Sequence, residues 1–279
     1  MSQRNLIIVP FGGLANRIRV ILSAINLAQK FNLKLKVYWI EREELNCDFN
    51  YLFQPIKNVE IKTFKNGFFF KVLIKLSSHL KIFLSFFNYI VISDKYIHKF
   101  LERDYFDCNP QILDHKLKNR SNKNIFFTTC AKFYNYDNND ISLLKVNHYV
   151  QNRVNLFLEK HSLTNYISIH IRYTDNVLAI NNSPLSIFES IINIELDFGR
   201  KIVICTDSEF VKNELEQKYS NILIFPETEK NRDSVIGIQD ALFELIILSK
   251  ANKVFGSYGS TYSLLATEIG NNPLIIVKK

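Results

Sequence analysis

The sequence has no long uninterrupted apolar run, although 47% of its 279 residues are hydrophobic. The nearest candidate, residues 68–92, is interrupted by lysines, whereas a membrane-spanning helix needs about 18 or more apolar residues. The apolar run after Met1 ends at Pro10, which is too short for a signal-peptide core. We therefore expect a cytoplasmic protein that does not span a membrane.

Cysteine and glycine are also scarce. The four cysteines are far apart in the sequence, and none forms a Cys-x-x-Cys pair. This spacing excludes a zinc ribbon or a redox dithiol and favours reduced, buried thiols. With eight glycines in the chain, we expect each where the backbone needs positive φ or a close approach, notably at the pairs Gly12/Gly13 and Gly256/Gly259.

The charge is biased towards basic residues: 35 Lys and Arg stand against 27 Asp and Glu, a formal net charge of +8. This balance suits a phosphate-bearing ligand, an anionic membrane surface or nucleic acid. The sequence contains no helix-turn-helix, no RNA-recognition signature and no basic stripe with interleaved aromatic residues. We therefore expect no nucleic-acid partner.

Strand and helix patterns alternate through both halves of the chain. In the first half, a strand at 6–9 leads through a Phe-Gly-Gly turn into a helix at 18–31 and a strand at 35–39, which is typical of a parallel crossover. In the second half, five strands alternate with four helices and predict a doubly wound parallel sheet. The predicted strands are 166–171, 201–205, 222–225, 253–255 and 274–277, and the predicted helices are 185–196, 209–219, 235–249 and 260–269.

A polar, Asn-rich region at 134–146 separates the two halves. We predict an α/β protein with a GT-B-like architecture, in which two Rossmann-like domains enclose a cleft. The predicted domains are residues 1–145 on the acceptor side and residues 146–279 around the nucleotide sugar. Residues 68–92 fit either a buried helix pair or a basic, aromatic surface, and the second reading predicts peripheral association with an anionic inner membrane.

A polar segment, His170-Ile171-Arg172-Tyr173-Thr174-Asp175, directly follows a predicted strand of the second half, where open α/β sheets bind ligands. Arg172 offers a rigid fork of donors suited to a diphosphate. The alternative interpretation pairs Arg172 with Asp175 to hold the loop.

Two further polar segments follow predicted strands of the same sheet. Cys205–Ser208 places Asp207 either in the ligand site or at a helix N-cap. Residues 255–261 are small or carry hydroxyls and precede a helix, so their N–H groups and hydroxyls would form an anion cradle.

Together these segments resemble the fucosyltransferase superfamily, which includes the α-1,6-fucosyltransferases, the nodulation fucosyltransferases and the protein O-fucosyltransferases. The resemblance rests on residues 12–17, 170–175, 240–251 and 256–268, which occur in the family's order. It implies GDP-fucose as the donor substrate, no separate cofactor, and a glycan or lipid-linked oligosaccharide as the acceptor.

The resemblance also implies roles for particular residues. Arg172 corresponds to the arginine that binds the β-phosphate, His170 to a histidine that lines the guanosine site, and Glu244 to the carboxylate that accepts from the guanine N–H groups. The expected catalytic residues are Arg172 and Asp175. The expected donor-binding residues are Gly12, Gly13, Asn16, Arg17, His170, Asp207, Asp240, Glu244, Ser257, Ser260 and Thr261.

The sequence departs from the pattern of the α-1,6-fucosyltransferases at three places. Tyr173 stands where those enzymes have a second arginine, Asn176 replaces a lysine, and residues 177–181 contain no carboxylate where those enzymes carry a glutamate base. The base is therefore left open. Its candidates are Asp175, Asp48, Glu41, Glu43 and Glu44.

These residues predict an inverting displacement at the anomeric carbon of the donor. A positioned arginine and several N–H donors would stabilise the leaving GDP, and the sequence contains no Asp-x-Asp, in agreement with a reaction that needs no metal. One alternative is a transferase of the same fold that uses another GDP-activated sugar. Another, of a different class, is a non-catalytic protein that binds a nucleotide sugar or nucleic acid.

Overall fold

The computed structural model describes residues 3–65, 89–93, 110–118 and 123–279, and the chain divides into two compact units. Unit 1 comprises Met1–Asn147 together with Arg232–Ile238, and unit 2 comprises His148–Asn231 together with Gln239–Lys279. The sequence predicted a single boundary, after residue 145, and did not predict that Arg232–Ile238 would group with the first unit.

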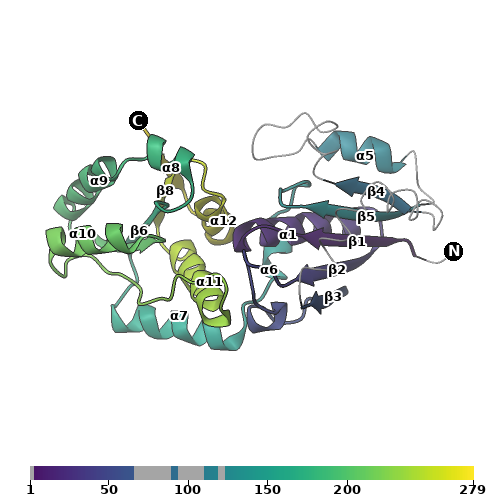
Figure 1. The fold of residues 1–279 in the computed structure, drawn as a ribbon, viewed down its shortest axis with the longest axis horizontal. Coiled ribbons are helices and arrows are strands. Elements are labelled where there is room, and N and C mark those ends of the chain that lie inside the picture. The colour runs from purple at the N-terminus through teal and green to yellow at the C-terminus, as the bar shows by residue number, and fades with distance from the viewer. Residues whose placement is uncertain (1–2, 66–88, 94–109, 119–122) are drawn as a thin grey trace. The chain divides into compact units, whose positions relative to one another are not determined.

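Unit 1 contains a parallel sheet of five strands in the order β3-β2-β1-β5-β4 (Figure 1). α1 carries buried apolar residues at steps of three and four, and it connects the central β1 to the parallel β2, as the sequence predicts. The elements are β1 (Asn5–Pro10), α1 (Leu14–Lys30), β2 (Lys34–Ile40), η1 (Phe49–Tyr51), β3 (Val59–Phe64), β4 (Tyr89–Ser93), α5 (Pro110–Lys118), β5 (Asn124–Thr129) and α6 (Asn138–Ser142).

Most of the segment 68–92, for which the sequence left two interpretations open, lies outside the described residues. Its last part is described, and there Tyr89–Ser93 forms β4, which pairs in parallel with β5. A helix that extends to Ile92 is therefore wrong, because the backbone of these residues is paired in the sheet. The structure describes nothing of residues 68–88.

Unit 2 contains a parallel sheet of four strands in the order β7-β6-β8-β9. The predicted strand at 222–225 is wrong in extent: Ile224 makes a single bridge to β7, through backbone hydrogen bonds with Ile202 and Ile204. The elements are α7 (His148–Lys160), β6 (Tyr166–Ile171), α8 (Val177–Asn182), α9 (Leu185–Asp197), β7 (Lys201–Thr206), α10 (Glu209–Tyr219), α11 (Val235–Ser249), β8 (Lys253–Ser257), α12 (Thr261–Gly270) and β9 (Leu274–Val277).

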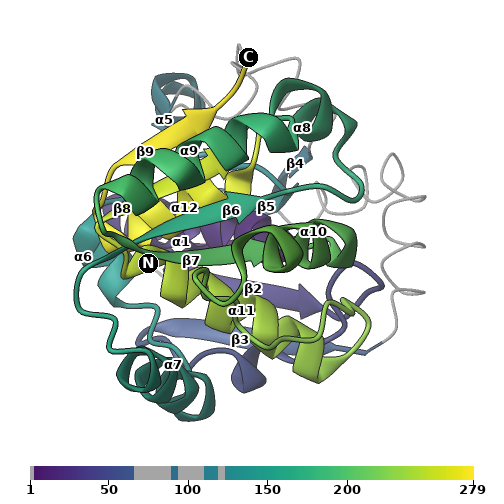
Figure 2. The same ribbon diagram turned by 90° about the vertical axis from the view of Figure 1, so that its left-hand side faces the viewer.

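Helices cover both faces of the sheet of unit 2. Ile167, Ile169 and Ile171 of β6 pack with α9 and α10 in one apolar core, and these two helices lie in front of the sheet in Figure 2. On the other face, the Tyr166 hydroxyl donates to the Ile247 carbonyl of α11 (2.6 Å), and α12 packs on β8. Every residue of β6 is consequently buried, and the predicted doubly wound sheet is confirmed.

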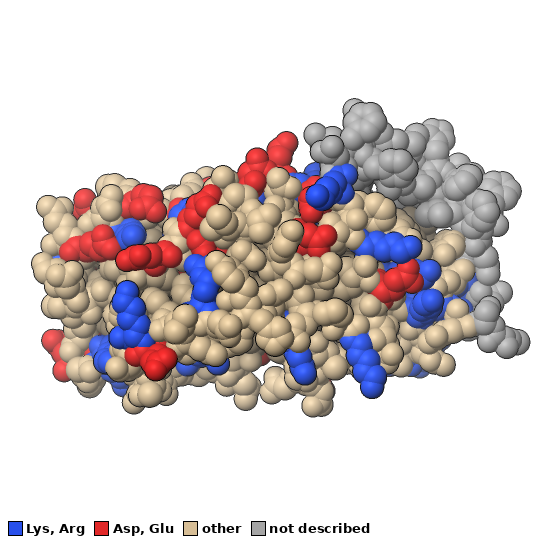
Figure 3. Space-filling model, turned by 90° about the horizontal axis from the view of Figure 1, so that it is seen from below, with Lys and Arg blue, Asp and Glu red and all other residues tan. Residues whose placement is uncertain are grey.

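Among the described residues, no helix is both long enough and apolar enough to cross a bilayer. On the face drawn in Figure 3, the described Lys and Arg side chains are interspersed with Asp and Glu. The described basic side chains of this face are therefore mixed with acidic ones rather than gathered in one patch.

Candidate functional site

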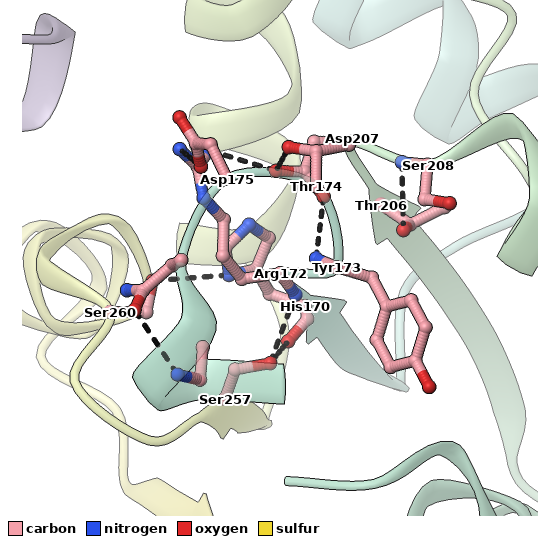
Figure 4. A network of polar contacts seen from close by, with 12 residues as sticks. His170, Arg172, Tyr173, Thr174, Asp175, Thr206, Asp207, Ser208, Ser257 and Ser260 are labelled. Carbon is pink, nitrogen blue, oxygen red and sulfur yellow. Dashed lines mark hydrogen bonds and ion pairs between the residues drawn. The ribbon is translucent and has the colours of Figure 1, made fainter. Parts of the chain in front are cut away.

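Polar side chains of unit 2 gather at the carboxyl ends of β6, β7 and β8 (Figure 4). The backbone N–H of Arg172, directly after β6, donates to the Ser257 hydroxyl at the end of β8 (2.9 Å). Ser257 in turn donates to the carbonyl of His170 (3.4 Å). This serine therefore joins the ends of two neighbouring strands and fixes the backbone from which Arg172 projects.

The guanidinium of Arg172 contacts two carboxylates. Its Nη2 donates to Asp175 Oδ1, and its Nη1 lies 3.0 Å from Asp207 Oδ2. The side chain of Arg172 is 24% exposed, that of Asp207 17% and that of Asp175 55%. The ion pair between Arg172 and Asp175, which the sequence offered as an alternative to a ligand site, is thus present in the structure.

Asp207 organises the loop that follows β6. Its Oδ1 accepts from the backbone N–H of Tyr173 and its Oδ2 from the Thr174 hydroxyl, both at 2.7 Å. The interpretation of Asp207 as a helix N-cap is wrong, because Ser208 is the N-cap of α10 and accepts from the Val211 N–H (3.3 Å). Asp207 therefore holds both the arginine and its loop.

His170 is buried behind this arginine. Its Nδ1 lies 2.8 Å from Ser263 Oγ and 3.4 Å from Ser260 Oγ, both on or next to α12, and its ring packs on that of Tyr262. Burial lowers the pKa of His170 to about 4, with a smaller opposing effect of Asp207. The imidazole is therefore neutral near pH 7 and contributes hydrogen bonding rather than charge.

The loop between β8 and α12, where the sequence predicts an anion cradle, is closely packed. Gly256 has no space for a side chain, since a Cβ there would lie 2.5 Å from the Ser263 side chain, so glycine allows α12 to approach β8. Ser260 is the N-cap of α12 and accepts from the Ser263 N–H (3.4 Å). The first N–H groups of a helix, here from Thr261 onwards, have no partner within the helix and suit an anion.

Two acids of α11 that the sequence singled out are buried and partnered. Asp240 Oδ1 lies 2.6 Å from Arg153 Nη2, and Asp240 Oδ2 accepts from the Glu229 N–H (2.7 Å). Glu244 accepts from Lys230 Nζ (2.5 Å) and from the Thr228 hydroxyl (2.6 Å). Both acids thus hold the polar loop that precedes α11.

Sequence reasoning missed the partners of these acids. Lys230, Thr228 and Arg153 belong to no motif, and they meet α11 only after the chain has folded. One available signal was Glu244 itself: a carboxylate on a helix as apolar as α11 needs a cation or hydrogen-bond donor nearby. The polar loop that immediately precedes the helix is the nearest source of one.

The predicted donor-binding residues of unit 1 lie around the turn between β1 and α1. Gly12 has φ = 80°, which favours glycine, and Gly13 is the N-cap of α1. Asn16, in the first turn of α1, is partly exposed.

The structure buries Arg17, another of the predicted donor-binding residues. Its guanidinium is buried within unit 1, where it donates to the carbonyls of Gly12 (2.8 Å) and Ile40 (2.6 Å) and packs over Trp39. Burial lowers its pKa to about 10. Arg17 therefore shapes the Gly12 turn from the inside.

The candidates for a base differ in what already binds them. Asp48 caps η1 by accepting from the Asn50 N–H (2.8 Å), and Glu44 lies 3.5 Å from Arg42 Nε. Asp175 forms an ion pair with Arg172, which precedes it by three residues in the sequence. Within the part of the chain that the structure describes, no three His, Cys, Asp or Glu side chains are grouped as metal ligands would be.

The described cysteines are free thiols, and two of the three are buried. Burial raises the pKa of Cys47 to about 12 and that of Cys205 well above its usual range. Neither thiol is an activated nucleophile.

No protein-family model and no curated protein sequence matches the chain. Solved structures do. The α-1,6-fucosyltransferase NodZ soaked with GDP-fucose has a TM-score of 0.65 at 16% sequence identity, over 96% of this chain and 93% of that one. NodZ from Bradyrhizobium has a TM-score of 0.62 at 16% identity, over 95% and 92%.

POFUT1 in complex with GDP-fucose has a TM-score of 0.57 at 13% identity and covers 99% of both chains. The chain has the fold of these fucosyltransferases. The predicted GT-B-like α/β class is therefore confirmed, and the fucosyltransferase fold extends over nearly the whole chain.

Proposed function

We propose that the chain is an inverting glycosyltransferase that moves a sugar, L-fucose, from a GDP-sugar to a glycan or lipid-linked acceptor. The observation that carries this proposal is Arg172, whose guanidinium is fixed at the carboxyl end of a buried parallel strand beside the anion cradle of α12. A fixed guanidinium and helix N–H groups are the donors that a leaving diphosphate requires. The fucosyltransferase fold supports the same choice, with residues 146–279 on the donor side and 1–145 on the acceptor side.

In the proposed reaction, the acceptor oxygen bonds to the anomeric carbon while the bond from that carbon to the β-phosphate oxygen breaks. GDP leaves with the electron pair, and Arg172 and the N–H groups of α12 stabilise the charge that develops on it. These groups supply the stabilisation without a metal ion, so we expect activity to persist in a chelator. The acceptor hydroxyl loses its proton to a base.

Asp175 is our choice for that base because of its position on Arg172. One arginine with two carboxylates carries a local charge of −1, which opposes a diphosphate. The donor must therefore replace one carboxylate. Asp207 is held by two further hydrogen bonds, whereas Asp175 is the more exposed of the two, so the diphosphate displaces Asp175 and leaves its carboxylate available to the acceptor.

We assign recognition of the guanine ring of the donor to Glu244. It lies on α11 next to the polar loop 226–231, and burial raises its pKa, against the effect of Lys230. A carboxylate there accepts from two guanine N–H groups at once. His170, Ser257, Ser260 and Thr261 complete the donor-binding residues of unit 2, and Asp240 positions the loop. Gly12, Gly13 and Asn16 are the proposed donor-binding residues of unit 1.

We further propose that the acceptor is made at an anionic membrane and that the protein associates with this membrane. The lysines of residues 68–92 would bind the anionic lipid. Co-sedimentation with vesicles that contain anionic lipid, at low and at high salt, tests that association. Protein that stays in the supernatant at low salt removes the membrane from the proposal.

The proposed function is tested by GDP release from a panel of GDP- and UDP-sugars, with the anomeric configuration of the product followed by NMR. Release from GDP-fucose with inversion supports the proposal. Preferential release from a GDP-linked mannose-derived or heptose donor changes the sugar and keeps the class. Tight binding of GDP without any release identifies a non-catalytic nucleotide-sugar-binding protein, and no binding of any nucleotide overturns the proposal.

A further inference from the structure

Lys230 is the lysine of the loop that precedes α11. Its Nζ donates to Glu244 Oε1 (2.5 Å) and to Thr228 Oγ1 (2.6 Å), and the side chain is 24% exposed. Thr228 itself donates to Glu244 Oε1 (2.6 Å). Lys230, Thr228 and Glu244 therefore form a closed triangle around one carboxylate oxygen.

This triangle leaves hydrogen-bonding capacity unused on both charged partners. An ammonium has three donors, of which two bind described residues here. Both hydrogen bonds that Glu244 accepts from described residues end on Oε1, so Oε2 accepts none from that part of the chain. One donor of Lys230 and one oxygen of the contacting Glu244 thus bind none of the described residues.

The pair lies in the same polar neighbourhood as Arg172. The charges of Lys230 and Arg172 both lower the pKa of His170 at the end of β6. Tyr262 connects the two places: its hydroxyl donates to the Ala241 carbonyl of α11, three residues before Glu244, and its ring lies 4.8 Å from that of His170 between the centroids. A ligand whose phosphates lie on Arg172 would therefore have its other end within reach of Lys230 and Glu244.

We propose that Lys230 is a specificity-determining residue that donates to the O6 carbonyl of guanine while Glu244 accepts from the neighbouring N1–H and the 2-amino group. This inference deepens the proposed function and rests on it. A donor beside an acceptor on the protein matches guanine, which presents an acceptor beside two donors along one edge. Lys230 and Glu244 keep their contact, since they read adjacent atoms of one ring.

Other bases match this pair less well. Adenine has an amino group where guanine has O6, so a donor would face the donor of Lys230. Hypoxanthine keeps O6 and N1–H but lacks the 2-amino group, so it tests Glu244 without changing the contact to Lys230. The two contacts can therefore be measured separately with purine nucleotides of the same size.

The test is calorimetric titration of GDP, IDP and ADP into the wild type, Lys230→Met and Glu244→Gln. In Lys230→Met we expect GDP and IDP affinities to fall together by about ten- to hundredfold, as for loss of a hydrogen bond from a charged group, while ADP changes little. Glu244→Gln should instead lower the preference for GDP over IDP. Lys230→Gln, which keeps a neutral donor, should lie between the wild type and Lys230→Met.

The chain offers a closely matched control in Lys253. Its Nζ lies 2.6 Å from the buried Glu195, its side chain is 22% exposed, and it lies at the opposite end of β8. Lys253→Met removes an equivalent ion pair without touching the proposed site, so the ratios between nucleotides should not change. Thermal unfolding of each variant confirms that the titrated protein is folded, and Lys230→Gln replaces Lys230→Met if the latter does not fold.

The outcomes separate the two proposals. A wild type that prefers GDP, with the same GDP-to-ADP ratio in Lys230→Met, overturns the role of Lys230 and leaves the proposed function standing. A lower melting temperature in that variant with unchanged ratios shows that the triangle only stabilises the loop. A wild type that binds none of the three nucleotides overturns both proposals.

Discussion

Asp175 and Asp207 bind the same guanidinium, that of Arg172, and Asp207 also binds the loop of Tyr173 and Thr174. Asp207 accepts two further hydrogen bonds, from Tyr173 and Thr174, and its side chain is 17% exposed against 55% for Asp175. Asp207 is therefore the less exposed and more extensively bonded of the two, and we expect a ligand to displace Asp175 rather than Asp207.

Asp175→Asn should separate donor affinity from turnover. Removal of a competing negative charge should raise the affinity for GDP by about five- to tenfold, since each unit charge at contact distance contributes about 1 kcal/mol even in water. Turnover should fall by about 10²–10⁴, the usual contribution of a general base. Titration of GDP and steady-state GDP release measure the two effects.

The comparison variant is Asp207→Asn, which loosens the loop of Tyr173 and Thr174 as well as the guanidinium. We expect it to lower both GDP affinity and turnover. An Asp175→Asn variant that binds GDP no better than the wild type would show that the diphosphate does not displace this carboxylate.

Arg172→Ala should abolish transfer while the protein stays folded. The loss of one charge-stabilising donor in such a site costs about 10²–10³ in rate. A lysine side chain at this position would restore the charge without the two-pronged contact, so Arg172→Lys should recover little. GDP release measures turnover, circular dichroism checks the fold, and near-normal turnover in Arg172→Ala would contradict the central role of this residue.

His170 should make the stability of the protein depend on pH below neutrality. Its pKa is about 4 when folded against 6.5 for the ordinary side chain, so between these values the unfolded state binds the proton and the folded state does not. The free energy of unfolding should therefore fall by about 2 kcal/mol between pH 7 and pH 5. Urea denaturation at both pH values measures the change.

The control for this prediction is the exposed His148, at the start of α7. In His170→Gln the fall in stability between pH 7 and pH 5 should shrink by about 2 kcal/mol, whereas in His148→Gln it should stay as in the wild type. Equal pH dependence in the wild type and His170→Gln would mean that His170 is accessible to protons in the folded state.

Arg17→Ala should destabilise unit 1. The guanidinium satisfies the carbonyls of Gly12 and Ile40 and fills space over Trp39, so its removal leaves buried acceptors without these donors and creates a cavity. We expect a loss of about 2–4 kcal/mol. Arg200→Ala is the control: its partner Glu195 keeps Lys253, so the loss should stay under about 1 kcal/mol.

The sequence predicted the elements of unit 2 where local pattern decides them. The bounds of β6, α10, α11 and β9 are those expected, because a buried strand or an apolar helical repeat is a property of consecutive residues. The pattern failed at 222–225, whose apolar run pairs with β7 at only one residue, Ile224.

The site was predicted less completely than the fold. The strand-end segments at 170–175 and 255–261 were identifiable because chain order places them at one edge of a parallel sheet. The partners that decide their chemistry come from elsewhere: Asp207 reaches the loop of Tyr173 across 34 residues, and Lys230 reaches Glu244 across 14. The resemblance suggested Arg17 as a donor-binding residue, and nothing near it in sequence shows that its side chain is buried.

The assignment of Arg232–Ile238 to unit 1 affects what a protease can do to this chain. Asn46 donates to the Arg232 carbonyl (3.2 Å) and to Asp233 (3.0 Å), and α11 continues from this segment into unit 2 without a break. Hydrolysis of one peptide bond near Asn147 therefore cannot release two complete units. A chain nicked there should still migrate as one particle on a sizing column and separate into two fragments only in denaturant.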